Sequence, residues 1–189
     1  MVNKIEGPEQ SILLGIAREA LENSVRGQSL PEINLSQLPV NLQERGASFV
    51  TLTILSNLRG CIGTLEAYQA LALDVQEHAV AAALQDPRFP RVQPSELERI
   101  HIEVSVLSPK TPLDYEGPED LIDKLRINID GVVLQDGYRK ATFLPQVWEK
   151  LPNKEQFLSH LCLKMGASAN LWQHKPLSVF TYQVQEFHE

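Results

Sequence analysis

The stretch "GASFVTLTILSNLRGCIGTL" (46–65) holds two strand patterns separated by a turn. Its first ten residues alternate between apolar and polar side chains, which predicts a β-strand over 46–55. Ser56 and Asn57 are residue types that turns favour, and the segment 58–65 that follows is short, β-branched and broken by glycines. The stretch therefore predicts an antiparallel pair of strands joined by a tight turn.

Helix and strand patterns are interspersed around this pair without regular β-α alternation. Apolar side chains recur at helical spacing over 8–27 and 68–86, and the segment 99–107 alternates strictly. Further along, the patterns predict a helix at 117–125, a hairpin at 131–144 that turns at Asp136-Gly137, a helix at 157–166 and one last strand at 177–187. This mixture favours an α+β fold, with a mainly antiparallel sheet flanked by helices.

Two local patterns make more specific predictions. His78 follows Asp74 by four residues on the polar side of the second helix, which predicts a pair at the surface. In "PSELE" (94–98), Ser95 and Glu98 have the spacing of a capping box, in which a side chain at each position bonds to the other's backbone.

The composition argues against several classes of protein. At 189 residues, the chain is long enough for one full hydrophobic core and short for two independent ones. Its 24 acidic residues outnumber 17 scattered basic ones, which argues against a nucleic-acid-binding surface. The polar N-terminus lacks the apolar segment of a signal peptide, and no apolar run is long enough to cross a bilayer. We therefore expect a cytoplasmic protein that binds neither nucleic acid nor membranes.

The chain has two cysteines, Cys61 and Cys162. Their spacing matches neither a disulfide framework nor a zinc site, so we expect no metal. No phosphate-binding glycine loop, dinucleotide fingerprint or serine-hydrolase elbow is present, so we expect no cofactor. Cys162 lies on an apolar stripe of the predicted helix at 157–166, which indicates packing in the core.

The segment "LRGCIG" (58–63) has two interpretations. If it is extended, Arg59 and Cys61 point to the same face, and a cation near the sulfur favours the reactive thiolate. Gly60 and Gly63 would then leave the backbone open to a ligand or another chain. In the alternative, the glycines serve a bulge, Cys61 fills a small gap, and Arg59 pairs with a surface carboxylate.

Three more residues are candidates for chemistry. His101 and Glu103 share one face of the strand at 99–107. They would supply a base or metal ligands there, or they form the solvated face of a half-buried sheet, which we favour because no second pair with metal-site spacing accompanies them. Arg88 in "DPRFP" (86–90) follows a helix end. Its guanidinium would hold a carboxylate or phosphate there, or it is an ordinary surface arginine in a turn.

Taken together, these segments resemble the AMMECR domain, the family of the AMME chromosomal region candidate protein. The matching pieces follow one another along nearly the whole chain: "LRGCIGT" (58–64), "AVAAALQDPRFPRV" (79–92), "ELERIHIEVSVLSP" (96–109), "GVVLQDGYRKATFLPQVW" (131–148) and "FLSHLCLKMG" (157–166). The resemblance implies a single domain over 1–189. It also implies a larger and a smaller lobe built from interleaved segments, with a cleft near the first of these pieces.

The family has no established reaction. Its prokaryotic members form the A component of the AmmeMemoRadiSam system, so the resemblance implies a modification pathway with a Memo-like protein and a radical SAM protein. On this basis Cys61, Arg59 and Glu103 are the catalytic candidates, and the ligand-contact candidates are Gly60, Gly63, Arg88 and His101. The alternative is a non-catalytic binding or scaffold subunit that recognises a small anion or a partner's segment. The sequence leaves this choice and the oligomeric state open.

Overall fold

The structure, a computed structural model, describes residues 4–189, which form two compact units. Unit 1 comprises the residues up to Ser108 together with Gln185–Glu189, and unit 2 comprises Pro109–Val184. The chain therefore builds most of unit 1, then the whole of unit 2, and returns to unit 1 at its end. Both units combine helices with antiparallel strands, which confirms the predicted α+β fold.

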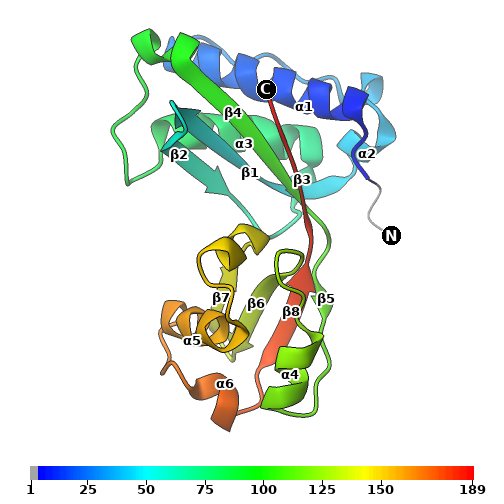
Figure 1. The fold of residues 1–189 in the computed structure, drawn as a ribbon. Helices are drawn as coiled ribbons and strands as arrows, with labels where there is room; N and C mark the ends of the chain where they lie inside the picture. Colours follow the sequence, from blue (N-terminus) through cyan, green and yellow to red (C-terminus); the bar gives the residue numbers. More distant parts are fainter. Residues whose placement is uncertain (1–3) are drawn as a thin grey trace. The chain divides into compact units, whose positions relative to one another are not determined.

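Unit 1 contains helices α1 (Gly7–Val25), α2 (Val40–Gln43) and α3 (Leu71–Leu84), the 3-10 helices η1 (Leu35–Gln37) and η2 (Pro94–Arg99), and strands β1 (Arg45–Ile54), β2 (Asn57–Gly63), β3 (Gln69–Ala70), β4 (Ile100–Leu107) and β9 (Val184–His188). The sheet has the order β2-β1-β4-β9, and β3 also pairs with β1 (Figure 1). Because β1 and β2 are antiparallel neighbours, the strand pair predicted over 46–65 is confirmed.

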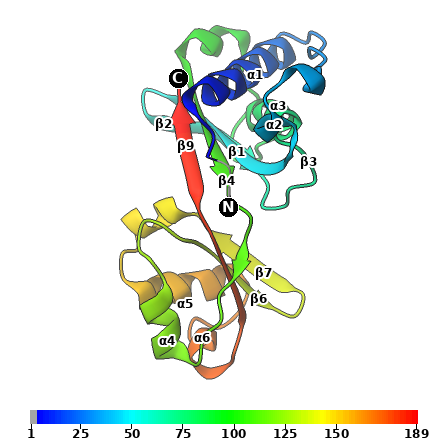
Figure 2. The same cartoon turned by 90° about the vertical axis from the view of Figure 1, so that its right-hand side faces the viewer.

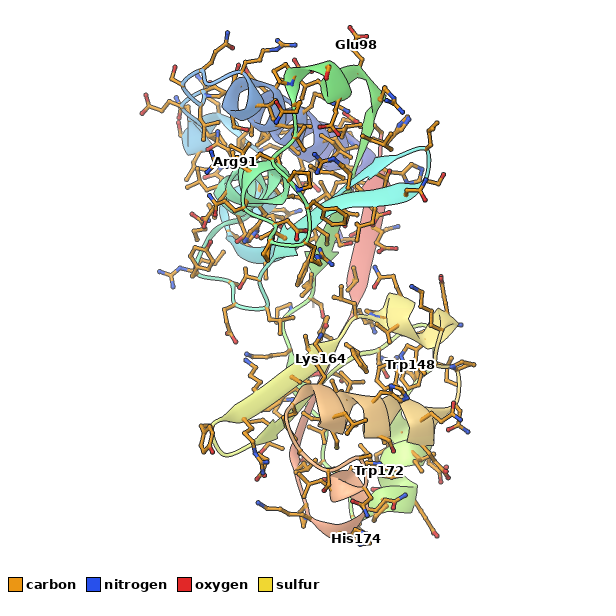
Figure 3. The ribbon with its side chains drawn as sticks, turned by 90° about the vertical axis from the view of Figure 1, so that its left-hand side faces the viewer. Arg91, Glu98, Trp148, Lys164, Trp172 and His174 are labelled. Atoms are coloured by element: carbon orange, nitrogen blue, oxygen red, sulfur yellow. The ribbon has the colours of Figure 1, made fainter. Side chains whose placement is uncertain are left out.

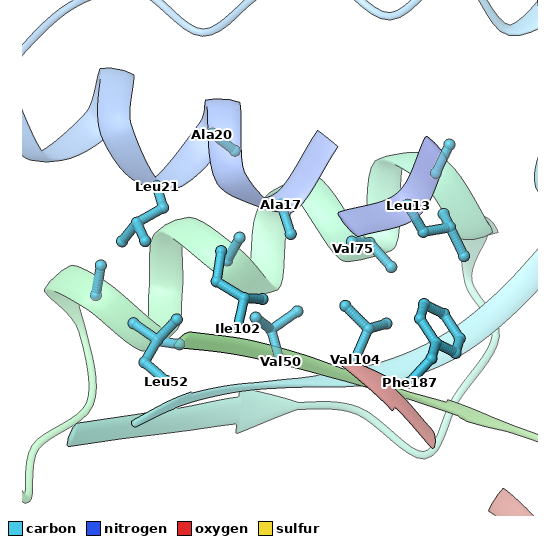
Figure 4. Packing of buried hydrophobic residues seen from close by; sticks show 14 of the residues in the cluster. Leu13, Ala17, Ala20, Leu21, Val50, Leu52, Val75, Ile102, Val104 and Phe187 are labelled. Atoms are coloured by element: carbon cyan, nitrogen blue, oxygen red, sulfur yellow. The ribbon is translucent and has the colours of Figure 1, made fainter. Parts of the chain in front are cut away.

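The core of unit 1 lies between this sheet and the two long helices. Figure 4 shows apolar side chains of α1 and α3 pointing toward those of the strands: Leu13, Ala17, Ala20, Leu21 and Val75 from the helices, and Val50, Leu52, Ile102, Val104 and Phe187 from the strands. The strict alternation of β4 explains this arrangement, because residues two apart on a strand share a face. Each fully buried Leu or Val side chain stabilises the fold by about 2 kcal/mol.

Both ends of α1 carry common helix-capping features. Glu6 and Glu9 form a capping box at its start, and Pro8 lies in the first turn, where its missing N–H costs no hydrogen bond. After the last turn, Gly27 has a φ of 69°, the left-handed conformation that commonly ends a helix. The first helix therefore begins and ends close to where the sequence places it.

The prediction of a surface pair for His78 and Asp74 is wrong. Both side chains are buried, and Asp74 Oδ2 accepts a hydrogen bond from the Ser48 hydroxyl at 2.6 Å and lies 3.1 Å from His78 Nδ1. The reason is that α3 packs on α1 as well as on β1 and β2. A helix covered on two sides buries more of its circumference than its apolar stripe indicates.

The predicted capping box at 94–98 is displaced. The residues that bond reciprocally are Gln93 and Glu96, at the start of η2, rather than Ser95 and Glu98. This shift places the Glu96 carboxylate at the first turn of η2, where it also forms an ion pair with Arg59 of β2.

Unit 2 contains strands β5 (Thr111–Pro112), β6 (Gly131–Asp136), β7 (Arg139–Phe143) and β8 (Ser178–Tyr182), helices α4 (Pro118–Lys124), α5 (Lys154–Lys164) and α6 (Leu171–His174), and the 3-10 helix η3 (Pro145–Glu149). The strand order is β5-β8-β6-β7. Its core holds both tryptophans of the chain, Trp148 and Trp172 (Figure 3), and Trp148 stacks on Phe157 with ring centroids 3.6 Å apart. Cys162 is fully buried in the same core, as predicted.

The last predicted strand, 177–187, is in fact two strands in two sheets. β8 pairs with β5 and β6 in unit 2, whereas β9 pairs with β4 in unit 1 (Figure 2). Alternation along a strand indicates which side chains share a face. It does not indicate where the chain leaves one sheet and joins another. Within residues 4–189, no helix has the length and apolar character needed to cross a membrane.

Candidate functional site

The segment "LRGCIG" forms most of β2, an edge strand of the unit 1 sheet. The register places Cys61 opposite Thr51 of β1, and Thr51 opposite Glu103 of β4. Side chains directly opposite one another lie on the same face of a sheet. Cys61, Thr51 and Glu103 therefore form a row across the face opposite the α1–α3 core, and we call these three residues the Cys61 row.

The Cys61 thiol is half-buried and accepts a hydrogen bond from Thr51 Oγ1 at 3.2 Å. Burial raises the pKa of the thiol, and the Asp86 and Glu103 carboxylates raise it further. The Thr51 hydrogen bond and the Arg88 charge lower this pKa, but by less than burial raises it. Near neutral pH the group is therefore a thiol rather than the nucleophilic thiolate.

Arg59 does not lower the pKa of Cys61 in the way the extended interpretation predicts. It is the extra residue at an irregularity of the β1–β2 register, since Leu58 and Gly60 have partners on β1 and Arg59 has none there. Its guanidinium donates to both Glu96 carboxylate oxygens, at 2.7 and 3.0 Å, and to the Pro90 carbonyl oxygen at 2.9 Å. Arg59 thus pairs with a carboxylate, as the alternative interpretation predicts.

Asp86 and Arg88 cover the open edge of β2 at Cys61. The Cys61 N–H donates to Asp86 Oδ2 at 2.8 Å, and Arg88 Nη2 donates to the Cys61 carbonyl oxygen at 3.0 Å. An edge strand exposes backbone groups that would otherwise pair with a further strand, and this pair of side chains satisfies them. The sequence analysis did not identify Asp86 as a site residue. Its position two residues before Arg88 was the one available indication that the two side chains pair.

The same two side chains also neutralise each other. Arg88 donates through Nε to Asp86 Oδ1 at 2.9 Å and through Nη2 to Asp86 Oδ2 at 2.7 Å. These hydrogen bonds, with those from the backbone, hold the pKa of Asp86 well below its usual range. The carboxylate is buried, whereas the Arg88 side chain is 54% exposed. Arg88 is therefore the accessible member of the pair.

Gly60 and Gly63 are required by close packing. A Cβ on Gly60 would lie 2.2 Å from the Ala82 carbonyl oxygen of α3, and one on Gly63 would lie 2.3 Å from the Phe49 ring. The space next to these glycines, which the sequence reasoning left open for a ligand, is therefore occupied by neighbouring elements of unit 1. The glycines let α3 and β1 approach β2 closely.

His101 is exposed and lies opposite Thr53, beside the Cys61 row. Glu103 is half-buried and, in contrast to Asp86 and Glu96, makes no ion pair within residues 4–189. Over the same part of the chain, no three side chains among His, Cys, Asp and Glu are placed to hold a metal ion. The site thus combines a neutral thiol, a hydroxyl and an unpaired carboxylate.

Comparison with other proteins places the whole chain in one family. The AMMECR1 family model matches residues 14–187. A protein of Methanothermobacter thermautotrophicus is 39% identical to this chain, covering 96% of it and 94% of that protein. A protein of Thermofilum pendens is 35% identical, covering 100% of this chain and 93% of that protein.

A solved structure agrees with this result. The crystal structure of the uncharacterized protein PH0010 from Pyrococcus horikoshii matches with a TM-score of 0.88 at 29% identity, covering 99% of this chain and 94% of that one. The match extends over the segments of both units, and the family model spans nearly the whole sequence. This chain belongs to the AMMECR1 family.

Proposed function

We propose that this chain is a binding component of a modification pathway, that it acts with a Memo-like protein and a radical SAM protein, and that it binds through the Cys61 row. The pathway and its partners follow from the resemblance to the AmmeMemoRadiSam system. The observation that supports this choice of binding site is the Cys61 row itself. It presents a thiol, a hydroxyl and an unpaired carboxylate side by side on one face of the sheet.

The state of the thiol favours binding over nucleophilic catalysis. A catalytic cysteine needs an adjacent base or a lowered pKa, since the thiolate is the nucleophile. Here the pKa of Cys61 is raised, and its hydrogen-bond neighbour Thr51 is a hydroxyl. The nearest carboxylates, Asp86 and Glu103, oppose ionisation of the sulfur.

The charges around the row favour a segment of a partner protein over a free small anion. The two arginines near the row, Arg59 and Arg88, are each paired with a carboxylate of the same unit. A bound anion would have to compete with Glu96 or Asp86 for these guanidinium groups. Glu103, in contrast, is an unpaired acceptor for N–H groups of a partner segment.

Co-purification tests this proposal. We expect the tagged chain to retain the Memo-like and radical SAM proteins encoded in the same genome. Glu103→Gln should weaken this binding about tenfold, equivalent to about 1.4 kcal/mol, because it removes one charged acceptor. Glu19→Gln makes the same charge change at an exposed position of α1 and should leave the binding unchanged. Failure of the unaltered chain to retain either protein, or equal binding by both variants, contradicts the proposal.

A covalent role for Cys61 is a second candidate, favoured by the hydrogen bond that Thr51 donates to the sulfur. A donor at this position stabilises a thiolate once it forms. Cys61→Ser separates the two candidates: a binding role predicts that the variant keeps its partners and the activity of the pathway, and a covalent role predicts that it keeps its partners and loses the activity.

A further inference from the structure

A pocket of about 310 Å³ lies in unit 1 beside α3, away from the residues of the Cys61 row. Among the described residues, its lining has four apolar side chains and four polar ones: Leu30, Leu73, Val80 and Ala81, and Gln69, Gln76, Glu77 and Gln85. Small-molecule sites in proteins are typically concave and mostly apolar, with a few convergent polar groups. This pocket is more polar than that average, with apolar and polar side chains in equal number and one carboxylate among them.

The walls of the pocket are held in place by hydrogen bonds. Gln76 Nε2 donates to the Pro31 carbonyl oxygen at 2.9 Å, which ties the segment that carries Leu30 to α3. On another side, the Tyr68 hydroxyl donates to Glu77 Oε2 at 2.7 Å. Burial and the Glu77 carboxylate raise the pKa of Tyr68 to about 12, so this donor keeps its proton at neutral pH.

Some hydrogen-bond donors of the rim are taken up by acceptors of the protein itself. Gln69 Nε2 donates to Glu77 Oε2 at 2.5 Å, and Gln76 Nε2 is used by Pro31. The amide oxygens of Gln69 and Gln76 and the Glu77 Oε1 atom accept none of these bonds, and Gln85 adds a third amide to the lining. Among the described residues that line the pocket, Glu77 is the one charged group. The rim therefore carries a net negative charge and offers carboxylate and amide oxygens as acceptors.

We propose that this pocket binds a cationic nitrogen carried on an apolar stem, either an alkylammonium or an alkylguanidinium group. Glu77 and the two glutamine oxygens accept its N–H groups, while Leu30, Leu73 and Val80 contact its methylene groups. The volume lies near the lower limit of about 300 Å³ for ligand sites. It suits a small amine, or one lysine or arginine side chain of another protein.

Backbone-amide NMR of the full chain tests the charge preference. The probes are n-hexylammonium chloride, sodium hexanoate and hexanol, which share one alkyl stem and differ in charge. We expect saturable shifts around 28–31 and 69–85 with hexylammonium, weaker ones with hexanol and none with hexanoate. Saturable binding of hexanoate as tight as that of hexylammonium overturns the proposal, as do hexylammonium shifts that spread over the surface without saturating.

Two short peptides distinguish the sources of the cation. One carries a lysine between two leucines, and the other carries norleucine in place of that lysine. Tighter binding of the lysine peptide than of hexylammonium, with loss on norleucine, supports a protein side chain as the ligand. Binding of hexylammonium alone supports a free amine. Equal binding of both peptides removes the charge requirement and overturns the proposal.

Two variants test the assigned contacts. Glu77→Gln removes the charge but keeps an acceptor for Tyr68, and it should weaken hexylammonium binding about tenfold. Glu19→Gln on α1 serves as the matched control and should bind as the unaltered chain does. Leu30→Ala, at a position 42% exposed, should weaken binding severalfold without changing the preference for the cation. Unchanged affinity in both Glu77→Gln and Leu30→Ala overturns the proposal.

Discussion

Single side chains decide the chemistry around Cys61. The thiol lies beside Thr51, but its pKa is raised because burial outweighs the hydrogen bond and the Arg88 charge. The arginine two residues upstream is occupied by Glu96. A cysteine next to an arginine in the sequence is thus a weak indicator of an activated thiol, because the pairing of that arginine depends on a distant segment.

Alkylation kinetics test the state of the thiol. Because the pKa of Cys61 is raised, the rate of its reaction with iodoacetamide should keep increasing through pH 8.5, about the pKa of a free thiol, without reaching a plateau. Cys162 is fully buried and should react only on unfolding, so it provides an internal control. A plateau below neutral pH would show an activated thiolate and contradict the assignment.

Asp86 should contribute more to stability than its partner Arg88. Asp86→Asn leaves the partly buried Cys61 N–H and the Arg88 guanidinium with a weaker acceptor, and should lower the free energy of unfolding by about 2 kcal/mol. Arg88→Gln should cost less, since the Arg88 side chain is half exposed. Urea denaturation of both variants measures the difference, and equal losses would count against the edge-covering role.

The contribution of Asp86 also has a defined pH dependence. Folding lowers the pKa of this carboxyl group, so its stabilisation is present above the unfolded-state value of about 3.9 and is lost as the pH falls below it. The gap in stability between the unaltered chain and Asp86→Asn should therefore close as the pH decreases from about 4. A gap that stays constant down to pH 2 would contradict this linkage.

At the scale of elements, β2 is held by contacts on three sides. β1 pairs with it along one edge, Asp86 and Arg88 cover the other edge, and α3 lies over the inner face at Gly60. The prediction of a short strand that contains two glycines was correct. The reason for the glycines could not be predicted, because it depends on how closely the α3 backbone approaches.

Two glycine substitutions compare the close approach of α3 to Gly60 with a glycine that has free space beside it. Gly60→Ala should lower the free energy of unfolding by about 1–3 kcal/mol, since its Cβ would overlap the Ala82 carbonyl oxygen. Gly15→Ala, on an α1 position with no atom near the new Cβ, should raise it by up to about 1 kcal/mol. Thermal or urea unfolding of both variants measures the signs. A neutral Gly60→Ala would show that α3 moves freely away from β2.

The β1–β2 turn offers a stabilising change. Leu55 and Ser56 both have positive φ, 50° and 63°, although neither residue type favours this conformation, and the predicted turn lay one residue later. Type I′ turns favour Asn-Gly at these positions. The double substitution Leu55→Asn and Ser56→Gly should therefore raise the free energy of unfolding by about 1 kcal/mol, measured by urea denaturation. A loss of stability would indicate that the exposed Leu55 side chain makes a contact the fold needs.

At the scale of the whole molecule, sequence periodicity predicted single helices and strands. It missed the features that depend on contacts between segments distant in the sequence. The alternation of β4 and the spacing in α1 were sufficient to place both elements. The burial of His78 and the division of 177–187 into β8 and β9 were not predictable in this way. Both depend on which other helices and strands each segment packs against or pairs with. Short-range sequence patterns do not contain that information.

Unit 2 is one continuous segment with its own core, and both tryptophans lie in that core. We therefore expect the fragment 109–184 to fold alone, because its strands and helices already bury their apolar faces within it. Its tryptophan emission should match that of the full chain, and it should unfold cooperatively on heating. A red-shifted emission without a transition would contradict this expectation.

The proposed binding role of the Cys61 row is tested most directly by protection of the thiol. The rate of Cys61 alkylation is measured while increasing amounts of the Memo-like or radical SAM protein are added. If the row is the binding surface, the rate should fall in proportion to the fraction of chain bound and recover in Glu103→Gln, which binds more weakly. An unchanged rate in a complex that demonstrably forms would place the binding surface elsewhere and contradict the proposal.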